Sequence, residues 1–283
     1  MFLQLYLRIL TDETLSPATR ALFLNVHEAI PSRGDLGHHY QYIADARFII
    51  LTAIYQKHGP IIETMFLKLF QKGQERQGAA QIDGLMERPL MYVLYSILEI
   101  GQSLTLPPLL QTLLLSTAMS DRYFALRAIL QSKTMDMSEI KNIQTTIKEE
   151  WSSHPIGCEQ YIMCIATVDC DQTTDYIREL VNEPFFNINL AGHARTVARG
   201  WSANRKRCLM TKEGLMLTEE LFLKIGKVNQ MSAYSFLSSF GDLRKFNQEV
   251  QTTLVATLES MKSQLDPEKQ LSLSNQLTVL MKK

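Results

Sequence analysis

The stretch Leu243–Met261, which reads LRKFNQEVQTTLVATLESM, decides the fold class. Its apolar residues return every three or four positions, at Leu243, Phe246, Val250, Leu254, Leu258 and Met261. That spacing follows one face of an α-helix and does not match the strict alternation of a half-buried strand. The stretch therefore predicts an amphipathic helix whose apolar stripe packs against a neighbour.

The same period recurs along the whole chain. A second apolar stripe is formed by Ile43, Ala46, Ile50, Ala53 and Ile54. Turn dipeptides that would join two strands are missing between the apolar runs, and Asp83-Gly84 lies among polar and mixed residues. We predict an all-α fold of roughly fourteen helices, arranged in antiparallel pairs of the kind that build α-solenoids.

Capping residues and breakers mark the expected helix ends. A capping side chain directly precedes a proline at Ser16-Pro17 and at Asp266-Pro267. Asp136 is followed three positions later by Glu139, as in a capping box. These three places predict helix starts. Helix stops are predicted at Gly59-Pro60, Gly101 and His154-Pro155.

One composition shift interrupts an otherwise uniform chain. The segment Gln71–Gly84, QKGQERQGAAQIDG, is polar and contains glycines. It predicts a surface loop between two sets of helices, and a possible subdomain joint near 71–84. We otherwise expect one helical domain over residues 1–283.

Composition disfavours several functional classes. The 283 residues carry 29 basic and 29 acidic side chains, so no excess charge favours nucleic acid or an anionic membrane as a partner. The most apolar later segment contains Pro107 and Pro108 and is too short to cross a bilayer. Four cysteines at irregular spacings, Cys158, Cys164, Cys170 and Cys208, predict free thiols and a cytoplasmic protein.

The histidines give no metal-binding pattern. His27-Glu28 resembles the start of the H-E-x-x-H signature of zinc peptidases, but the position of the second histidine is Pro31, which cannot bind a metal. His38 and His39 are adjacent and point about 100° apart on a helix. A nucleophile elbow and phosphate-binding glycine loops are missing as well. We therefore predict no metal site and no catalytic residue in this chain.

The best polar candidate is Gly192–Cys208, GHARTVARGWSANRKRC. Arg195 and Arg199 are four positions apart and share one helix face, where two guanidinium groups could bind a carboxylate. Arg205, Lys206 and Arg207 follow in a polar turn. The alternative is that the first pair forms ion pairs with a neighbouring helix and the second cluster is solvated.

Three blocks of the sequence resemble a known family. They are ILTDETLSPATRALFLNV (9–26), YIADARFIILTAI (42–54) and FNINLAGHARTVARGW (186–201). The sequence resembles, over nearly its whole length and in the same order, the C-terminal helical domain of the zinc-dependent aminopeptidase N family, of the bacterial alanyl type. The resemblance implies a superhelical bowl that closes over the active site of the enzyme and lacks the first helices of the family's domain.

The resemblance also implies a function. The zinc ion and the catalytic residues of the family lie in other domains, so this chain would need no cofactor of its own and would have the catalytic domain of the same aminopeptidase as its partner. It would form the access channel for peptide substrates, from which the enzyme releases N-terminal amino acids. Arg195 matches a position that faces the cavity in the family, whereas Ser235 and His193 stand where the family has other arginines.

Two alternatives stay open. The helix pairs alone also fit an independent α-solenoid scaffold that binds another protein through a concave face. Scattered polar residues could in addition meet in the folded chain and make it an autonomous enzyme, because fold does not fix function.

Overall fold

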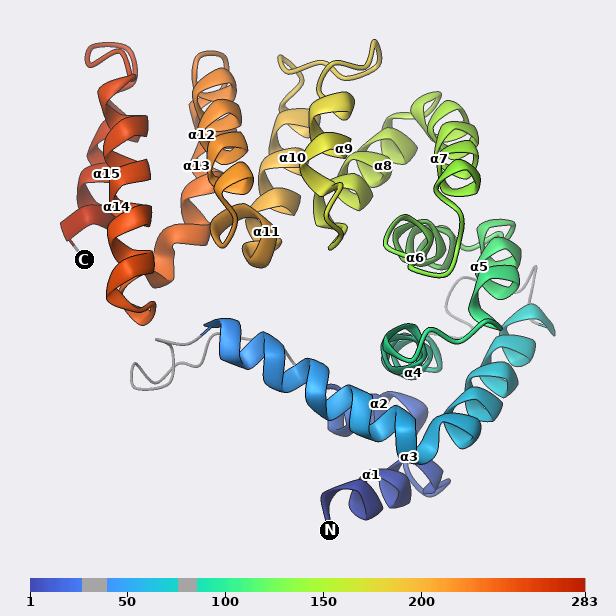
Figure 1. Ribbon diagram of the computed structural model, residues 1–283. Coiled ribbons are helices and arrows are strands. Elements are labelled where there is room, and N and C mark those ends of the chain that lie inside the picture. Colours follow the sequence, from blue (N-terminus) through green and yellow to red (C-terminus); the bar gives the residue numbers. More distant parts are fainter. Residues whose placement is uncertain (27–39, 76–85, 283) are drawn as a thin grey trace. The chain divides into compact units, whose positions relative to one another are not determined.

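The structure is a computed structural model that describes residues 1–26, 40–75 and 86–282. These residues form fifteen α-helices and one 3₁₀ helix, with no strand among them, which confirms the all-α prediction (Figure 1). They divide into two compact units, unit 1 up to Asp136 and unit 2 from Met137 onward. The predicted joint at 71–84 lies largely outside the described residues and stays a prediction.

Unit 1 contains six helices within the described residues. They are α1 (Phe2–Thr11), α2 (Pro17–Leu24), α3 (Tyr40–Glu75), α4 (Arg88–Ile100), α5 (Leu106–Leu114) and α6 (Met119–Leu130). The chain packs α1 on α2 and α3, α2 and α3 on α4, and α5 on α6. The ring of Phe124 on α6 stacks on Tyr92 of α4, with the ring centroids 4.2 Å apart.

The predicted stop at Gly59-Pro60 is wrong, because α3 runs through it with Pro60 inside the helix. A proline removes one backbone hydrogen bond and bends a helix without always ending it. Figure 1 shows α3 changing direction in this part of the chain. His58 is therefore not at a helix end, and its buried ring donates a hydrogen bond of 3.0 Å from Nε2 to the Leu3 carbonyl of α1.

The second predicted stripe is only partly correct. Ile54 is fully buried, but Ala46 is exposed, and the neighbouring residues Ala44 and Leu51 are buried instead. The buried face of α3 is thus rotated from the predicted one. The reason is that the helix packs on both α1 and α4, so its contacts are not confined to one stripe.

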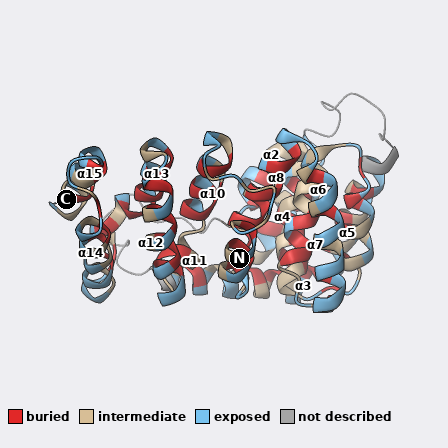
Figure 2. Cartoon of the chain, turned by 90° about the horizontal axis from the view of Figure 1, so that it is seen from above, coloured by how far each residue is buried: buried red, intermediate tan, exposed pale blue. Residues whose placement is uncertain are grey.

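Unit 2 consists of stacked helices in two layers. The first layer contains α8 (Pro155–Thr167), α10 (Ala191–Ala203), α13 (Gln230–Leu237) and α15 (Leu271–Lys282), each in contact with the next. The second contains α7 (Met137–Ser152), α9 (Thr173–Leu180), α12 (Lys212–Gly226) and α14 (Gln248–Ser263). Short connections are made by α11 (Arg205–Leu209) and the 3₁₀ helix η2 (Ser238–Lys245). Figure 2 shows α10, α13 and α15 in one row and α12 and α14 in the other.

The stretch Leu243–Met261 packs in the core as predicted, but it does not form one continuous helix. Leu243 lies in η2, Phe246 has extended backbone, and α14 begins at Gln248 after an Asn247 cap whose side chain accepts from the Val250 N–H at 2.9 Å. The six stripe residues are buried except for half-buried Val250. The residues at the apolar positions therefore stay in the core although the helix is interrupted between η2 and α14.

Most predicted helix ends are confirmed. The Ser16 side chain caps α2 at Pro17, α7 begins at Met137 directly after Asp136, and Gly101 follows the end of α4. The predicted stop at His154-Pro155 is confirmed by the end of α7 at Ser152, and Pro155 then begins α8. The start at Asp266-Pro267 is wrong. There the Asp266 carboxylate accepts from the N–H groups of a short turn, at 3.0 and 3.1 Å, and α15 begins only at Leu271.

A close helix crossing in unit 2 lies between α8 and α10. A Cβ atom at Gly200 would lie 2.7 Å from the Cβ of Ala166 and 3.1 Å from the Sδ of Met163, so only glycine fits without movement. The next residue, Trp201, is fully buried, and its indole N–H donates to Thr218 Oγ1 on α12 at 2.8 Å. Gly200 and Trp201 together fix α10 against α8 and α12.

We expect Gly200→Ala to lower the free energy of unfolding of unit 2 by about 1–2 kcal/mol. Overpacking costs about 1–3 kcal/mol, which outweighs the gain of up to about 1 kcal/mol in helix propensity because the Ala166 methyl group cannot rotate away. Urea unfolding followed by tryptophan fluorescence measures this change, since both tryptophans, Trp151 and Trp201, are buried in unit 2.

Gly241→Ala is the matched control, because a Cβ atom at Gly241 meets nothing within 4 Å. It should leave the unfolding midpoint almost unchanged. A Gly200→Ala variant as stable as the unchanged chain would contradict the packing argument.

Candidate functional site

Arg195 and Arg199 lie one turn apart on the exposed face of α10. The opposite face of the helix is buried against its neighbours through His193, Ala194, Val197, Ala198 and Trp201. Within the described part of the chain, neither guanidinium group has an ion-pair partner. The described residues therefore do not neutralise the pair, and its role stays a prediction.

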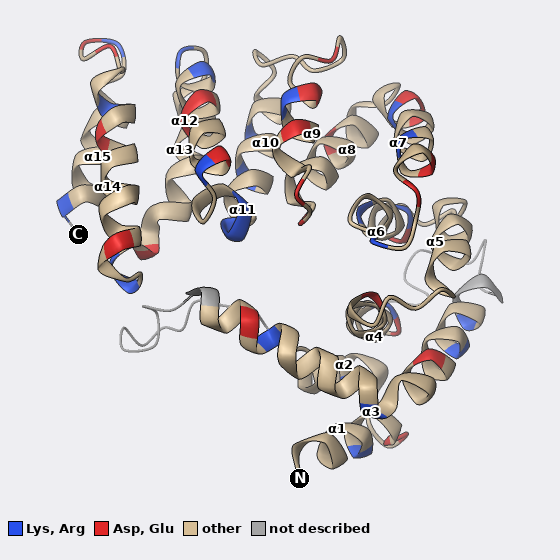
Figure 3. Ribbon diagram, in the orientation of Figure 1, with Lys and Arg blue, Asp and Glu red and all other residues tan. Residues whose placement is uncertain are grey.

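Charge is distributed unequally between the two layers of unit 2. The first layer has one charged residue in α8, two in α10, none in α13 and one in α15. The second has five in α7, three in α9, five in α12 and three in α14, a contrast that can be followed in Figure 3. We refer to α8, α10, α13 and α15 as the low-charge layer, and to α7, α9, α12 and α14 as the high-charge layer.

The low-charge layer also exposes large apolar side chains. Met231 is 82% exposed, Ile156 75% and Leu271 58%. The only carboxylate that its four helices carry is Glu159. Few internal anions thus compete for Arg195 and Arg199, and the layer can contact a chain that is partly apolar and negatively charged at one end.

Arg205, Lys206 and Arg207 are not a solvated cluster. Arg205 pairs with Asp242 at 2.8 Å, and Arg207 pairs with Asp169 at 2.6 Å and with the exposed Asp171. Lys206 also reaches Asp169, at 3.2 Å. The alternative drawn from the sequence was that Arg195 and Arg199 form ion pairs and that the cluster 205–207 is solvated. Both parts are wrong, because the cluster 205–207 forms the ion pairs and Arg195 and Arg199 form none with the described residues.

Asp169 is the centre of this cluster. Burial raises the pKa of its carboxyl group, but the hydrogen bond from Arg207 and the positive charges of Lys206 and Arg207 outweigh burial and hold the pKa below its ordinary value. The carboxylate ties the turn after α8 to α11, which lies directly after the arginine-bearing helix. This cluster stabilises the fold and is already neutralised.

His193 serves packing rather than substrate contact. Its Nδ1 accepts a hydrogen bond from the Asn187 N–H at 3.1 Å, so the ring proton is on Nε2, which lies 3.5 Å from the Sγ of Cys158. Burial lowers the pKa of His193 and raises that of Cys158, so both groups are neutral near pH 7. A protonated Nε2 cannot take a proton from the thiol, and the pair is not a nucleophile with its base.

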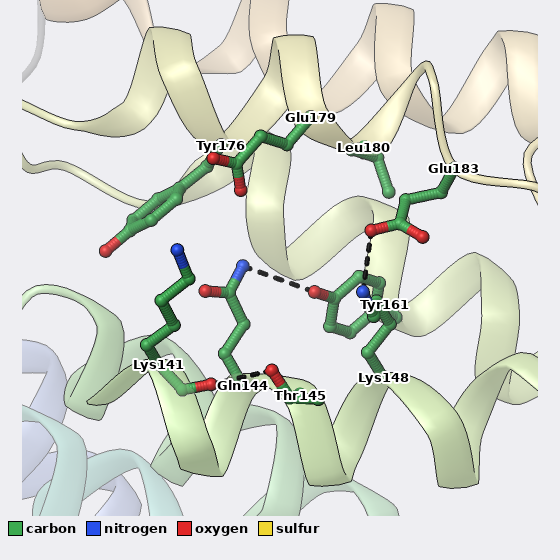
Figure 4. A pocket seen from close by; sticks show the side chains of 9 residues that line it. All are labelled: Lys141, Gln144, Thr145, Lys148, Tyr161, Tyr176, Glu179, Leu180 and Glu183. Carbon is green, nitrogen blue, oxygen red and sulfur yellow. Dashed lines mark hydrogen bonds and ion pairs between the residues drawn. The ribbon is translucent and has the colours of Figure 1, made fainter. Parts of the chain in front are cut away.

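A small pocket lies between α7, α8 and α9 and was not anticipated from the sequence. Figure 4 shows Gln144 and Lys148 of α7 reaching toward Tyr161 and Glu183, with the Lys148 ammonium 2.6 Å from Glu183 and the Gln144 amide 3.3 Å from the Tyr161 hydroxyl. Its volume of about 40 Å³ is too small for a peptide. The pocket is a polar joint between helices.

The remaining histidine candidates fall outside this region. His27, Glu28, His38 and His39 lie outside the described residues. In the described part of the chain, no three or more His, Cys, Asp or Glu side chains come together in a way that could hold a metal ion. A helix with the length and apolarity needed to cross a membrane is likewise not found there.

We expect Asp169→Asn to lower the free energy of unfolding of unit 2 by about 1 kcal/mol at pH 7, a modest value because the carboxyl group is partly exposed to solvent. The folded-state pKa is depressed, so the stabilisation is present above the unfolded-state pKa of about 4 and is lost as the pH falls through the folded-state value. Urea unfolding at pH 7 and at pH 3 measures both changes.

Asp175→Asn is the control, since Asp175 is exposed and lies 3.8 Å from Arg178, its ion-pair partner among the described residues. It should have little effect at either pH. A difference between the Asp169→Asn variant and the unchanged chain that grows on acidification would contradict the assignment.

Comparison with known proteins fits this geometry. Residues 1–272 match the family model described as "Domain of unknown function (DUF3458_C) ARM repeats". The fold is similar to that of Legionella pneumophila aminopeptidase A, solved in complex with aspartic acid, with a TM-score of 0.74 and 14% sequence identity. The match covers 98% of this chain and 33% of that protein, so the chain spans about a third of its length. No curated protein matches the sequence. The chain belongs to the DUF3458_C family of ARM-repeat domains, the C-terminal helical domain of the aminopeptidase N family.

Proposed function

We propose that this chain is the non-catalytic C-terminal domain of a zinc aminopeptidase. In that role the low-charge layer lines the path by which peptides reach the catalytic domain. The zinc ion, the general base and the residues that bind the substrate amino group belong to that catalytic domain, which is the main partner. The reaction is the release of N-terminal amino acids from peptides, and the location is the cytoplasm, as the free cysteines suggest.

The observation that carries the proposal is the exposed pair Arg195 and Arg199 on a layer with few charges. An exopeptidase that acts at the amino end of a peptide leaves the carboxylate at the far end, whatever the sequence of the substrate. Two guanidinium groups one turn apart suit a carboxylate, because each can donate two parallel hydrogen bonds. Exposed apolar side chains elsewhere on the same layer, such as Met231 and Ile156, would tolerate many substrate side chains.

The proposal assigns a steric role to the fold as well. A domain of stacked helices beside a catalytic cleft excludes folded proteins and admits short or extended chains. Substrate selection by length follows from this arrangement. The arginine pair adds a weak attraction that grows only when a substrate is long enough to reach α10.

We expect Arg195→Gln with Arg199→Gln, introduced into the full enzyme, to raise KM for a tetrapeptide about tenfold. A lost charge-assisted interaction of about 1.4 kcal/mol corresponds to that factor. KM for alanyl p-nitroanilide, which has no distant carboxylate, should not change. Steady-state kinetics with the tetrapeptide, its C-terminal amide and the chromogenic substrate measure the three cases.

The matched control is Lys212→Gln with Lys224→Gln, which removes the same charge from exposed positions of α12 in the high-charge layer. It should change none of the three KM values. An equal loss with all substrates, or an equal loss in the control, would remove the channel role from Arg195 and Arg199.

A protein-binding scaffold is the second candidate. It is favoured by the exposed Met231, Ile156 and Leu271 on stacked repeats, since such apolar surface commonly contacts a protein partner.

The isolated chain, assayed with zinc and alanyl p-nitroanilide, gives a first test of the proposed non-catalytic role. Robust turnover by the chain alone would exclude a non-catalytic domain, and activity that appears only with the catalytic domain would support it.

A further inference from the structure

Unit 1 contains a groove between α2 and α4 that the proposed function does not use. Its volume of about 480 Å³ lies within the range of ligand-binding pockets. The walls are mostly small or apolar and include Ala18, Ala21, Leu22 and Val93. A bound chain could therefore approach the two helix backbones closely.

Arg47 of α3 is the only charged residue among those that line the groove. Its Nε donates to the Val26 carbonyl at 2.8 Å, which holds the guanidinium group in place and leaves its two terminal nitrogens as donors. None of the carboxylates in the described ranges forms an ion pair with Arg47. The groove thus presents one fixed positive charge at its α3 side.

Two hydroxyl groups in the groove are available only as acceptors. The Tyr92 hydroxyl donates to the Ser120 carbonyl at 3.3 Å, and the Ser96 hydroxyl donates to the Val93 carbonyl at 2.7 Å. Each oxygen keeps a lone pair, but its proton is already used. Burial raises the pKa of Tyr92 to about 12, so the phenol stays neutral. A ligand that displaces water from these two oxygens would need to donate hydrogen bonds to them, and amide N–H groups can do so.

We propose that this groove binds the C-terminal end of a short apolar peptide. Arg47 receives the terminal carboxylate, Tyr92 and Ser96 accept from amide N–H groups of the peptide, and Leu22 with Val93 contacts its apolar side chains. An aliphatic carboxylate satisfies the arginine and the apolar walls but leaves both hydroxyl oxygens without donors. The inference rests on unit 1 alone, so its failure would leave the proposed function untouched.

The test uses N-acetyl-alanyl-leucine as the probe and follows the methyl signals of Leu22 and Val93 by NMR during titration of the chain. We expect the peptide acid to shift these signals and to bind about tenfold more tightly than its C-terminal amide. Arg47→Gln should remove that difference between acid and amide. Octanoate should bind at least about tenfold more weakly than the peptide acid, because it brings no N–H donor.

Two further variants separate binding from folding. Arg8→Gln removes an exposed arginine of α1 outside the groove and should bind like the unchanged chain. Ser96→Met fills the groove without touching Arg47 and should abolish the shifts even if Arg47→Gln fails to fold. Equal binding of acid and amide by the unchanged chain would overturn the proposal, and so would octanoate binding as tightly as the peptide or unchanged binding in Ser96→Met.

Discussion

The close crossing of α10 over α8 at Gly200 is the constraint on which unit 2 depends. With no side chain at this position, α10 approaches Ala166 so closely that one face of the helix is excluded from solvent along most of its length. Trp201 then reaches Thr218 on α12, and His193 reaches Cys158 on α8. The exposure of Arg195 and Arg199 follows from this packing, since the two positions point away from a face that is fixed on the other side.

The two layers of unit 2 differ in their number of charged residues, and this difference distinguishes their surfaces. In the high-charge layer and the turns beside it, acidic and basic groups lie close enough to pair, as Lys148 does with Glu183 and Arg207 with Asp169. Such pairs contribute little each and keep the surface hydrated. In the low-charge layer, Arg195 and Arg199 form no ion pair with the described residues, and apolar side chains such as Met231 and Ile156 are exposed. For this reason we propose a flexible peptide as the ligand of this layer.

The groove of unit 1 also contains an arginine that has no carboxylate partner among the described residues. Arg47 is held by a backbone carbonyl, so its charge is fixed in position without being neutralised. Hydrogen bonds within the chain use up the protons of the nearby hydroxyl groups and leave their oxygens as acceptors. In both units the proposed ligand is an anion, because the arginine assigned to it has no carboxylate partner in the described chain.

The helical class and most helix ends can be predicted from the amino-acid sequence, because periodicity and capping act within one or two turns. Leu254, Leu258 and Met261 are buried as predicted, and Ser16 caps α2. Local signals failed at Gly59-Pro60 and Asp266-Pro267, where packing and a competing turn decided the outcome. Partners distant in sequence were decided only by the tertiary structure. Asp169 meets Arg207 across 38 positions, and no local pattern distinguishes that arginine from Arg195, which has no ion-pair partner among the described residues. Helix packing decides which arginine a described carboxylate neutralises, because an ion pair needs two groups within about 4 Å and spacing in the sequence does not fix that distance.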